Sequence, residues 1–140
     1  MSSALTIAKY IVNRCAESGT PISNLQLQKI LYFVQLAFLK QLNKPCFSDD
    51  IEAWQFGPVV PLVYYHFCGF GAMPIWATYK LDSISHAEII NHVVDEKKKM
   101  NPWDLVAESH KEGSPWNQIY QDGQGNHKVI PLNLMKAEVK

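Results

Sequence analysis

The segment from Asn24 to about Leu42 constrains the fold of this 140-residue chain most strongly. Ser23, followed three residues later by Gln26, forms a capping box, which predicts that a helix begins at Asn24. Apolar side chains cover more than half of the circumference of this helix instead of a single stripe. A helix of this composition is usually buried on most of its sides. We therefore expect it to be the central helix of its domain, with five nearly fully buried side chains: Leu27, Ile30, Leu31, Val34 and Phe38.

Two further helices are expected, one before and one after the central helix. A first helix runs from about Ser3 to Ser18, because its apolar residues recur on one face and Gly19 offers a left-handed stop. Another begins near Pro61, which is tolerated only in a first helical turn, and ends at Gly69 and Gly71.

The C-terminal half contains three more helix starts. Ser85 with Glu88 reads as a second capping box and predicts a helix to about Lys99. The pairs Asn101-Pro102 and Ser114-Pro115 each place a capping side chain before a proline at the first helical position. They predict a helix from Trp103 to about His110 and a short helical turn around Trp116.

Extended structure is expected in few places. Residues 51–56 favour a short extended piece before a turn at Gly57-Pro58, and residues 127–130 favour another after the turn at 122–126. A weak helix closes the chain. The predicted fold class is therefore mainly α, a single compact helical domain over residues 1–140 with one or two short β segments.

Charge and composition argue against several classes of function. The chain has 13 basic and 13 acidic residues, so it lacks the excess of Lys and Arg that binds nucleic-acid phosphates. Nucleic acid is thus an unlikely partner, and a role as a transcriptional regulator is disfavoured. No apolar stretch is long enough to span a bilayer, and no secretory signal precedes the first helix. Cys15, Cys46 and Cys68 are odd in number and widely spaced, which fits reduced cysteines in a cytoplasmic protein.

Three stretches in a fixed order carry a family resemblance, and with their spacing they span almost the whole chain. Residues 22–35 read ISNLQLQKILYFVQ, residues 51–61 read IEAWQFGPVVP, and residues 102–116 contain PWDL, then Ser-His, then Ser-Pro-Trp. These blocks resemble the signature of the Panacea domain, the family of SocA-like antitoxins and phage-associated GepA proteins. One departure is that Leu36-Ala37-Phe38 stands where relatives often carry a small, an aromatic and a polar residue.

The resemblance implies a role as the antitoxin of a toxin–antitoxin pair. The expected partner is a protein toxin and, if the chain acts as an adaptor, also a cytoplasmic AAA+ protease. No cofactor and no metal are expected. The residues that match the family blocks and could contact a partner are Gln28, Tyr32, Gln35, Glu52, Trp54, His110 and Trp116.

Gln28, Tyr32 and Gln35 fall on one stripe of the central helix, at spacings of four and then three residues. On a helix that is otherwise apolar these polar groups need hydrogen-bond partners, since an unpaired buried polar group costs about 1–3 kcal/mol. They form either an internal network beside the Glu52–Pro58 segment or a recognition groove. We expect Gln35, at the more exposed end of the stripe, to be the residue that contacts a partner.

An enzyme is the main alternative. A small-ligand or catalytic site could be built from Gln28, Tyr32, Gln35, Glu52 and His110, and a cysteine–histidine hydrolase could use Cys46 or Cys68 with His66 or His110. No glycine-rich elbow or oxyanion signature surrounds any cysteine, and the histidines lack metal-ligand spacing. The sequence therefore predicts a non-enzymatic binding protein.

Overall fold

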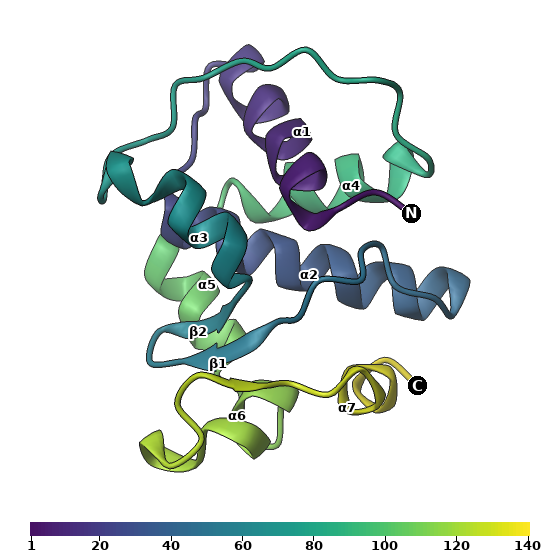
Figure 1. The fold of residues 1–140 in the computed structure, drawn as a ribbon, viewed down its shortest axis with the longest axis vertical. Coiled ribbons are helices and arrows are strands. Elements are labelled where there is room, and N and C mark those ends of the chain that lie inside the picture. Colours follow the sequence, from purple (N-terminus) through teal and green to yellow (C-terminus); the bar gives the residue numbers. More distant parts are fainter.

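The computed structural model describes residues 1–140 as a mostly helical chain with a small sheet (Figure 1). The helices are α1 (Ala4–Glu17), α2 (Asn24–Leu42), α3 (Pro61–Phe67), α4 (Ala87–Lys97), α5 (Pro102–Ser109), α6 (Pro115–Tyr120) and α7 (Leu132–Glu138). Two short 3-10 turns, η1 (Cys68–Phe70) and η2 (Gln121–Gly123), follow α3 and α6. The strands are β1 (Glu52–Trp54), β2 (Gly57–Val59) and β3 (Lys128–Val129). The expected mainly helical class is confirmed.

The helix α2 is the centre of the fold, as its sequence predicts. Both bonds of the Ser23–Gln26 capping box are present at its start. In Figure 1 it runs through the middle of the molecule, with α1 and α4 on one side and the β hairpin, α6 and α7 on the other, and it contacts α1, α4, β2 and α7. The five predicted core side chains are at most 5% exposed; they are Leu27, Ile30, Leu31, Val34 and Phe38.

Side-chain caps are present at half of the other helix starts, those of α1, α5 and α6. Asn101 caps α5 and Ser114 caps α6, and each helix has proline in its first turn. The expected capping box at Ser85 and Glu88 is wrong: α4 begins at Ala87, and its N-cap His86 is left-handed, with φ of 59°, and makes no side-chain cap. The apolar face of α4, and not a local cap, determines where this helix lies, because Ile90 and Val94 are both fully buried.

The sheet is antiparallel with the strand order β2-β1-β3. Glu52 pairs with Val59 across the hairpin and with Val129 on the other side. The expected turn at Gly57-Pro58 lies two residues earlier, at Gln55 and Phe56, and Gly57 and Pro58 belong to β2. Extended structure was expected at residues 51–56 and 127–130, and these regions contain β1 and β3, which pair with each other; the second strand of the hairpin, β2, was not expected.

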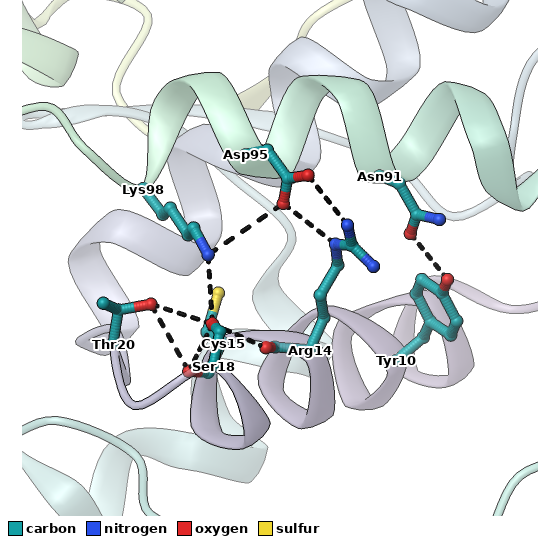
Figure 2. Close-up of polar contacts among 8 residues, drawn as sticks. All are labelled: Tyr10, Arg14, Cys15, Ser18, Thr20, Asn91, Asp95 and Lys98. Carbon is teal, nitrogen blue, oxygen red and sulfur yellow. Dashed lines mark hydrogen bonds and ion pairs between the residues drawn. The ribbon is translucent and has the colours of Figure 1, made fainter.

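Polar side chains join α1 to α4 (Figure 2). Arg14 donates two hydrogen bonds to Asp95, at 2.9 and 2.7 Å, and Tyr10 donates one to Asn91 at 2.6 Å. The hydrogen bonds from Arg14 lower the pKa of the Asp95 carboxyl. Both charged side chains are more than a third exposed, so the pair adds only about 0.5–1 kcal/mol to stability. These contacts orient the two helices, and buried apolar side chains supply most of the stability.

Residues 71–86 connect η1 to α4 without regular secondary structure and pass over α1 (Figure 1). The segment is tied down at two points. Ile75 is fully buried and donates its backbone N–H to the carbonyl of Ile22, and the Asn13 amide exchanges two hydrogen bonds with the backbone of Tyr79. Trp76 lies between these anchors and is 63% exposed. No helix is both long and apolar enough to cross a membrane.

Candidate functional site

A groove with a volume of about 480 Å³ opens between the β hairpin, the N-terminal half of α2, α3 and α5. Its walls come from segments far apart in the sequence, which the hairpin and α2 bring together. The side chains and backbone that line it are Asn24, Leu25, Gln28, Lys29, Trp54, Gln55, Phe56, Val59, Tyr64, Cys68, Gly71, Ala72, Trp103, Asn126 and His127.

Aromatic side chains form the rim of this groove and remain exposed. Phe56 in the hairpin turn is 48% exposed and Trp103 on α5 is 59% exposed. Their rings meet edge to face at 5.6 Å. Large apolar side chains left in water at a concave surface are typical of binding sites. We refer to Phe56, Trp103 and the groove that they border as the aromatic groove.

Trp54 forms the wall on the side of the sheet and is held from several directions. Its indole N–H donates to the Glu52 carboxylate at 3.0 Å. Its ring stacks on His127 at 4.3 Å and meets Tyr64 edge to face at 5.0 Å. Glu52 thus acts here as a positioning group for Trp54.

Gln28 ties α2 to the start of α3 at the edge of the groove. Its amide N–H donates to Asn24 at 3.0 Å, and its carbonyl oxygen accepts from the Val60 N–H at 2.9 Å. Asn24 in turn donates to the carbonyl of Tyr64. Since Gln28 is only 1% exposed and uses both ends of its amide, its geometry is that of an internal network.

His110 at the end of α5 and Trp116 on α6 form a stacked pair that is connected to the hairpin. The two rings stack at 3.6 Å with an angle of 3° between their planes. Trp116 donates its indole N–H to the backbone carbonyl of Trp54 at 2.7 Å, which connects α6 to β1. The buried Nε2 of His110 has no hydrogen-bond partner, and burial, with a smaller effect of Lys29, lowers the pKa of the imidazole.

Gln35 and Tyr32 lie away from this cluster. Gln35 is 2% exposed, so the expectation that it occupies the more exposed end of the stripe is wrong. Its amide bonds to the loop after α2, donating to the carbonyl of Phe47 and accepting from the N–H groups of Cys46 and Phe47. Tyr32 is 2% exposed, and burial, with a smaller effect of Glu138, raises the pKa of its phenol. The predicted stripe therefore divides: Gln28 reaches the groove and Gln35 braces a loop.

The side chains considered for catalysis do not converge. Gln28 and Gln35 are engaged with different segments, and Glu52 is bonded to Trp54. Burial raises the pKa of the Cys15 thiol to about 11 and of Cys46 to about 12, which disfavours the nucleophilic thiolate. Cys68 lines the groove and donates to the carbonyl of Tyr65. No three histidine, cysteine or carboxylate side chains cluster in a way that could hold a metal ion.

Lys29 is the residue that sequence reasoning missed. Its side chain forms part of the groove floor, is 0% exposed, and donates to the carbonyl of Pro58 at 3.2 Å. Burial lowers its pKa to about 7. The hydrocarbon part of Lys29 runs directly beneath Gly57, where a Cβ atom would stand 2.5 Å from its Cε. The signal that could have revealed it is its position on a helix predicted to be buried on most sides.

Comparison with known proteins agrees with the sequence signature. The family model described as "Antitoxin SocA-like, Panacea domain" matches residues 27–117, which include the hairpin, Lys29 and the His110–Trp116 stack. The chain is also 33% identical to Antitoxin SocA of Caulobacter vibrioides (strain NA1000 / CB15N), over 98% of this chain and 80% of that protein. No solved structure is significantly similar.

Proposed function

The chain belongs to the Panacea domain family of SocA-like antitoxins, and from this membership we propose that it neutralises a protein toxin by binding it directly in the aromatic groove. The similar protein from Caulobacter vibrioides is named as an antitoxin. An antitoxin of this kind acts by binding alone and needs no catalytic residues. Of the seven candidate residues, Gln28 and Trp54 line the groove. Glu52, His110 and Trp116 support the hairpin, whereas Tyr32 and Gln35 lie elsewhere on α2 and serve the fold.

The observation that carries this proposal is the exposed Phe56–Trp103 pair at the rim of a groove of about 480 Å³. Tryptophan and other large aromatic side chains supply most of the free energy at protein interfaces, especially in pockets that become fully desolvated. Here the rings are pre-positioned by contact with each other, so little side-chain entropy is lost on binding. Such a surface suits an apolar segment of a folded or extended partner.

Direct inhibition of the toxin and its delivery to a cytoplasmic AAA+ protease share their first step. In both schemes the toxin must first be captured by this chain. We assign that capture to the aromatic groove, and delivery to a protease would be a later step that uses other surface. A variant that cannot capture the toxin is therefore inactive under either scheme.

Trp103→Ala is expected to abolish neutralisation in cells that co-express the toxin, the candidate being the product of the neighbouring open reading frame. Loss of a central interface tryptophan costs about 2–4 kcal/mol, which is roughly 30-fold to 700-fold in affinity. Because Trp103 is 59% exposed, the melting temperature should barely change. Growth of the co-expressing strain and thermal melting of the purified variant measure the two effects.

Trp76→Ala is the matched control, since Trp76 is 63% exposed and lies outside the groove. It should neutralise as well as the parent protein. If Trp103→Ala neutralises the toxin at the same dose as Trp76→Ala, the groove is not the capture site.

A further inference from the structure

Lys29 is a buried amine that has no counterion when it is charged. Its side chain is 0% exposed, and its single hydrogen bond goes to a neutral acceptor, the carbonyl of Pro58. An ammonium group carries three donors, so two remain unused. No carboxylate lies within ion-pair distance of its Nζ, although buried charges in proteins are almost always paired.

The groups around Lys29 contain no acidic side chain that could serve as its counterion. His110 at the end of α5 is close enough to interact with its charge, and the other titratable side chains of the groove are Tyr64, Cys68 and His127. The carboxylates of the neighbouring elements have other environments: Glu52 accepts from Trp54, Glu108 pairs with Lys97, and Asp104 is exposed. The lining of the aromatic groove includes one lysine and no Asp or Glu.

We propose that Lys29 is the anchor of the aromatic groove for an acidic side chain, a glutamate or aspartate, carried on an apolar segment of the toxin. This inference rests on the proposed function and names the chemistry of the partner at the same site. The toxin carboxylate supplies the counterion that the free protein lacks. The surrounding aromatic rim accommodates the apolar residues on either side of the acid.

The position of the amine favours a side chain over the C-terminal carboxylate of a partner. Lys29 forms part of the groove floor but lies just below its surface, because its exposed fraction is 0%. A carboxylate at the end of a flexible side chain can reach down to it, whereas a terminal carboxylate would draw the partner backbone into the floor. Access requires a local opening of the packing around Lys29, because its side chain is 0% exposed in the free protein.

Binding of an acidic side chain at Lys29 should be coupled to the uptake of a proton. In the free protein burial lowers the pKa of Lys29 to about 7, so the amine is largely neutral above that pH. A carboxylate beside it favours the charged form and raises the pKa in the complex. Binding therefore takes up a proton at Lys29 above pH 7, and affinity falls as the pH rises, by up to about tenfold per pH unit.

The test is isothermal titration calorimetry with the toxin identified by the co-expression assay, from pH 6.5 to 8.5, in buffers of different ionisation enthalpy. The parent protein should take up close to one proton at pH 8.5, and its affinity should fall by more than tenfold across the range. Lys29→Met, which keeps an unbranched side chain of nearly the same length without its charge, should bind at least tenfold more weakly at pH 6.5. Its affinity should depend less on pH than that of the parent protein.

The outcomes separate this inference from the proposed function. If Lys29→Met and the parent protein share one affinity and one pH dependence, the acidic anchor is wrong, while loss of binding in Trp103→Ala still supports the groove. If Trp103→Ala also binds normally, the proposed function itself is wrong. Should Lys29→Met fail to fold, proton uptake by the parent protein decides, and an uptake of zero at pH 8.5 overturns the anchor.

Discussion

Gly57→Ala is expected to lower the free energy of unfolding by about 3–5 kcal/mol. Gly57 has φ of +113°, a conformation that residues with a side chain rarely adopt. Its Cβ would also stand 2.5 Å from Lys29 Cε and 2.8 Å from Ser109 Oγ, both of which are buried. The backbone strain and the overpacking therefore add, because Lys29 and Ser109 pack against Gly57 and are at most 1% exposed. Urea denaturation of the purified variant measures the loss.

Gly69→Ala is the control for this substitution. Gly69 lies in the 3-10 turn η1 after α3, where a Cβ would meet nothing within 4 Å. Its free energy of unfolding should stay within about 0.5 kcal/mol of the parent value. Equal denaturation midpoints for the two variants would mean that β2 does not pack against Lys29 as described.

Gln35→Ala is expected to lower the free energy of unfolding by about 2–4 kcal/mol. The substitution leaves two N–H groups and one carbonyl of Cys46 and Phe47 without partners. Both residues are buried, so water cannot replace the amide without opening the loop after α2. The role of Gln35 is then structural, and any loss of neutralisation should follow the loss of folded protein. Chemical denaturation and toxin binding at a temperature where the variant is folded measure the two quantities.

Gln41→Ala provides the comparison on the same helix. Gln41 lies near the C-terminal end of α2 and is exposed, so its removal should change stability by no more than about 0.5 kcal/mol. A Gln35→Ala variant as stable as Gln41→Ala would contradict the buried network and return Gln35 to the list of candidate contact residues.

Local sequence signals predicted most of the fold because they have local physical causes. Free backbone N–H groups at the helix starts are bonded by nearby side chains, in the Ser23–Gln26 box and in the Asn101 and Ser114 caps. In the same way, the left-handed Gly19 ends the first helix through local backbone geometry. The start of α4 could not be predicted in this way. His86 takes a left-handed conformation there, and tertiary packing of the apolar face of α4 overrides the Ser85–Glu88 signal.

The site was predictable only in part. The family blocks brought Glu52, Trp54, His110 and Trp116 into one hypothesis, and the structure places these four around the hairpin. Phe56 and Trp103 were missed as a pair, because their contact joins a hairpin turn to a helix 47 residues later, counting from position 56 to position 103. Lys29 was missed because lysine is usually exposed, and only the three-dimensional packing of β2 on α2 shows that it is sealed.

Hydroxyl-radical footprinting of the tryptophans, with and without the toxin, tests the groove most directly. Trp103 and Trp76 are 59% and 63% exposed, so they should be oxidised at similar rates in the free protein and serve as internal references for each other. If the toxin binds in the aromatic groove, oxidation of Trp103 should fall severalfold in the complex while that of Trp76 stays the same. Protection of Trp76 with unchanged oxidation of Trp103 would contradict the account.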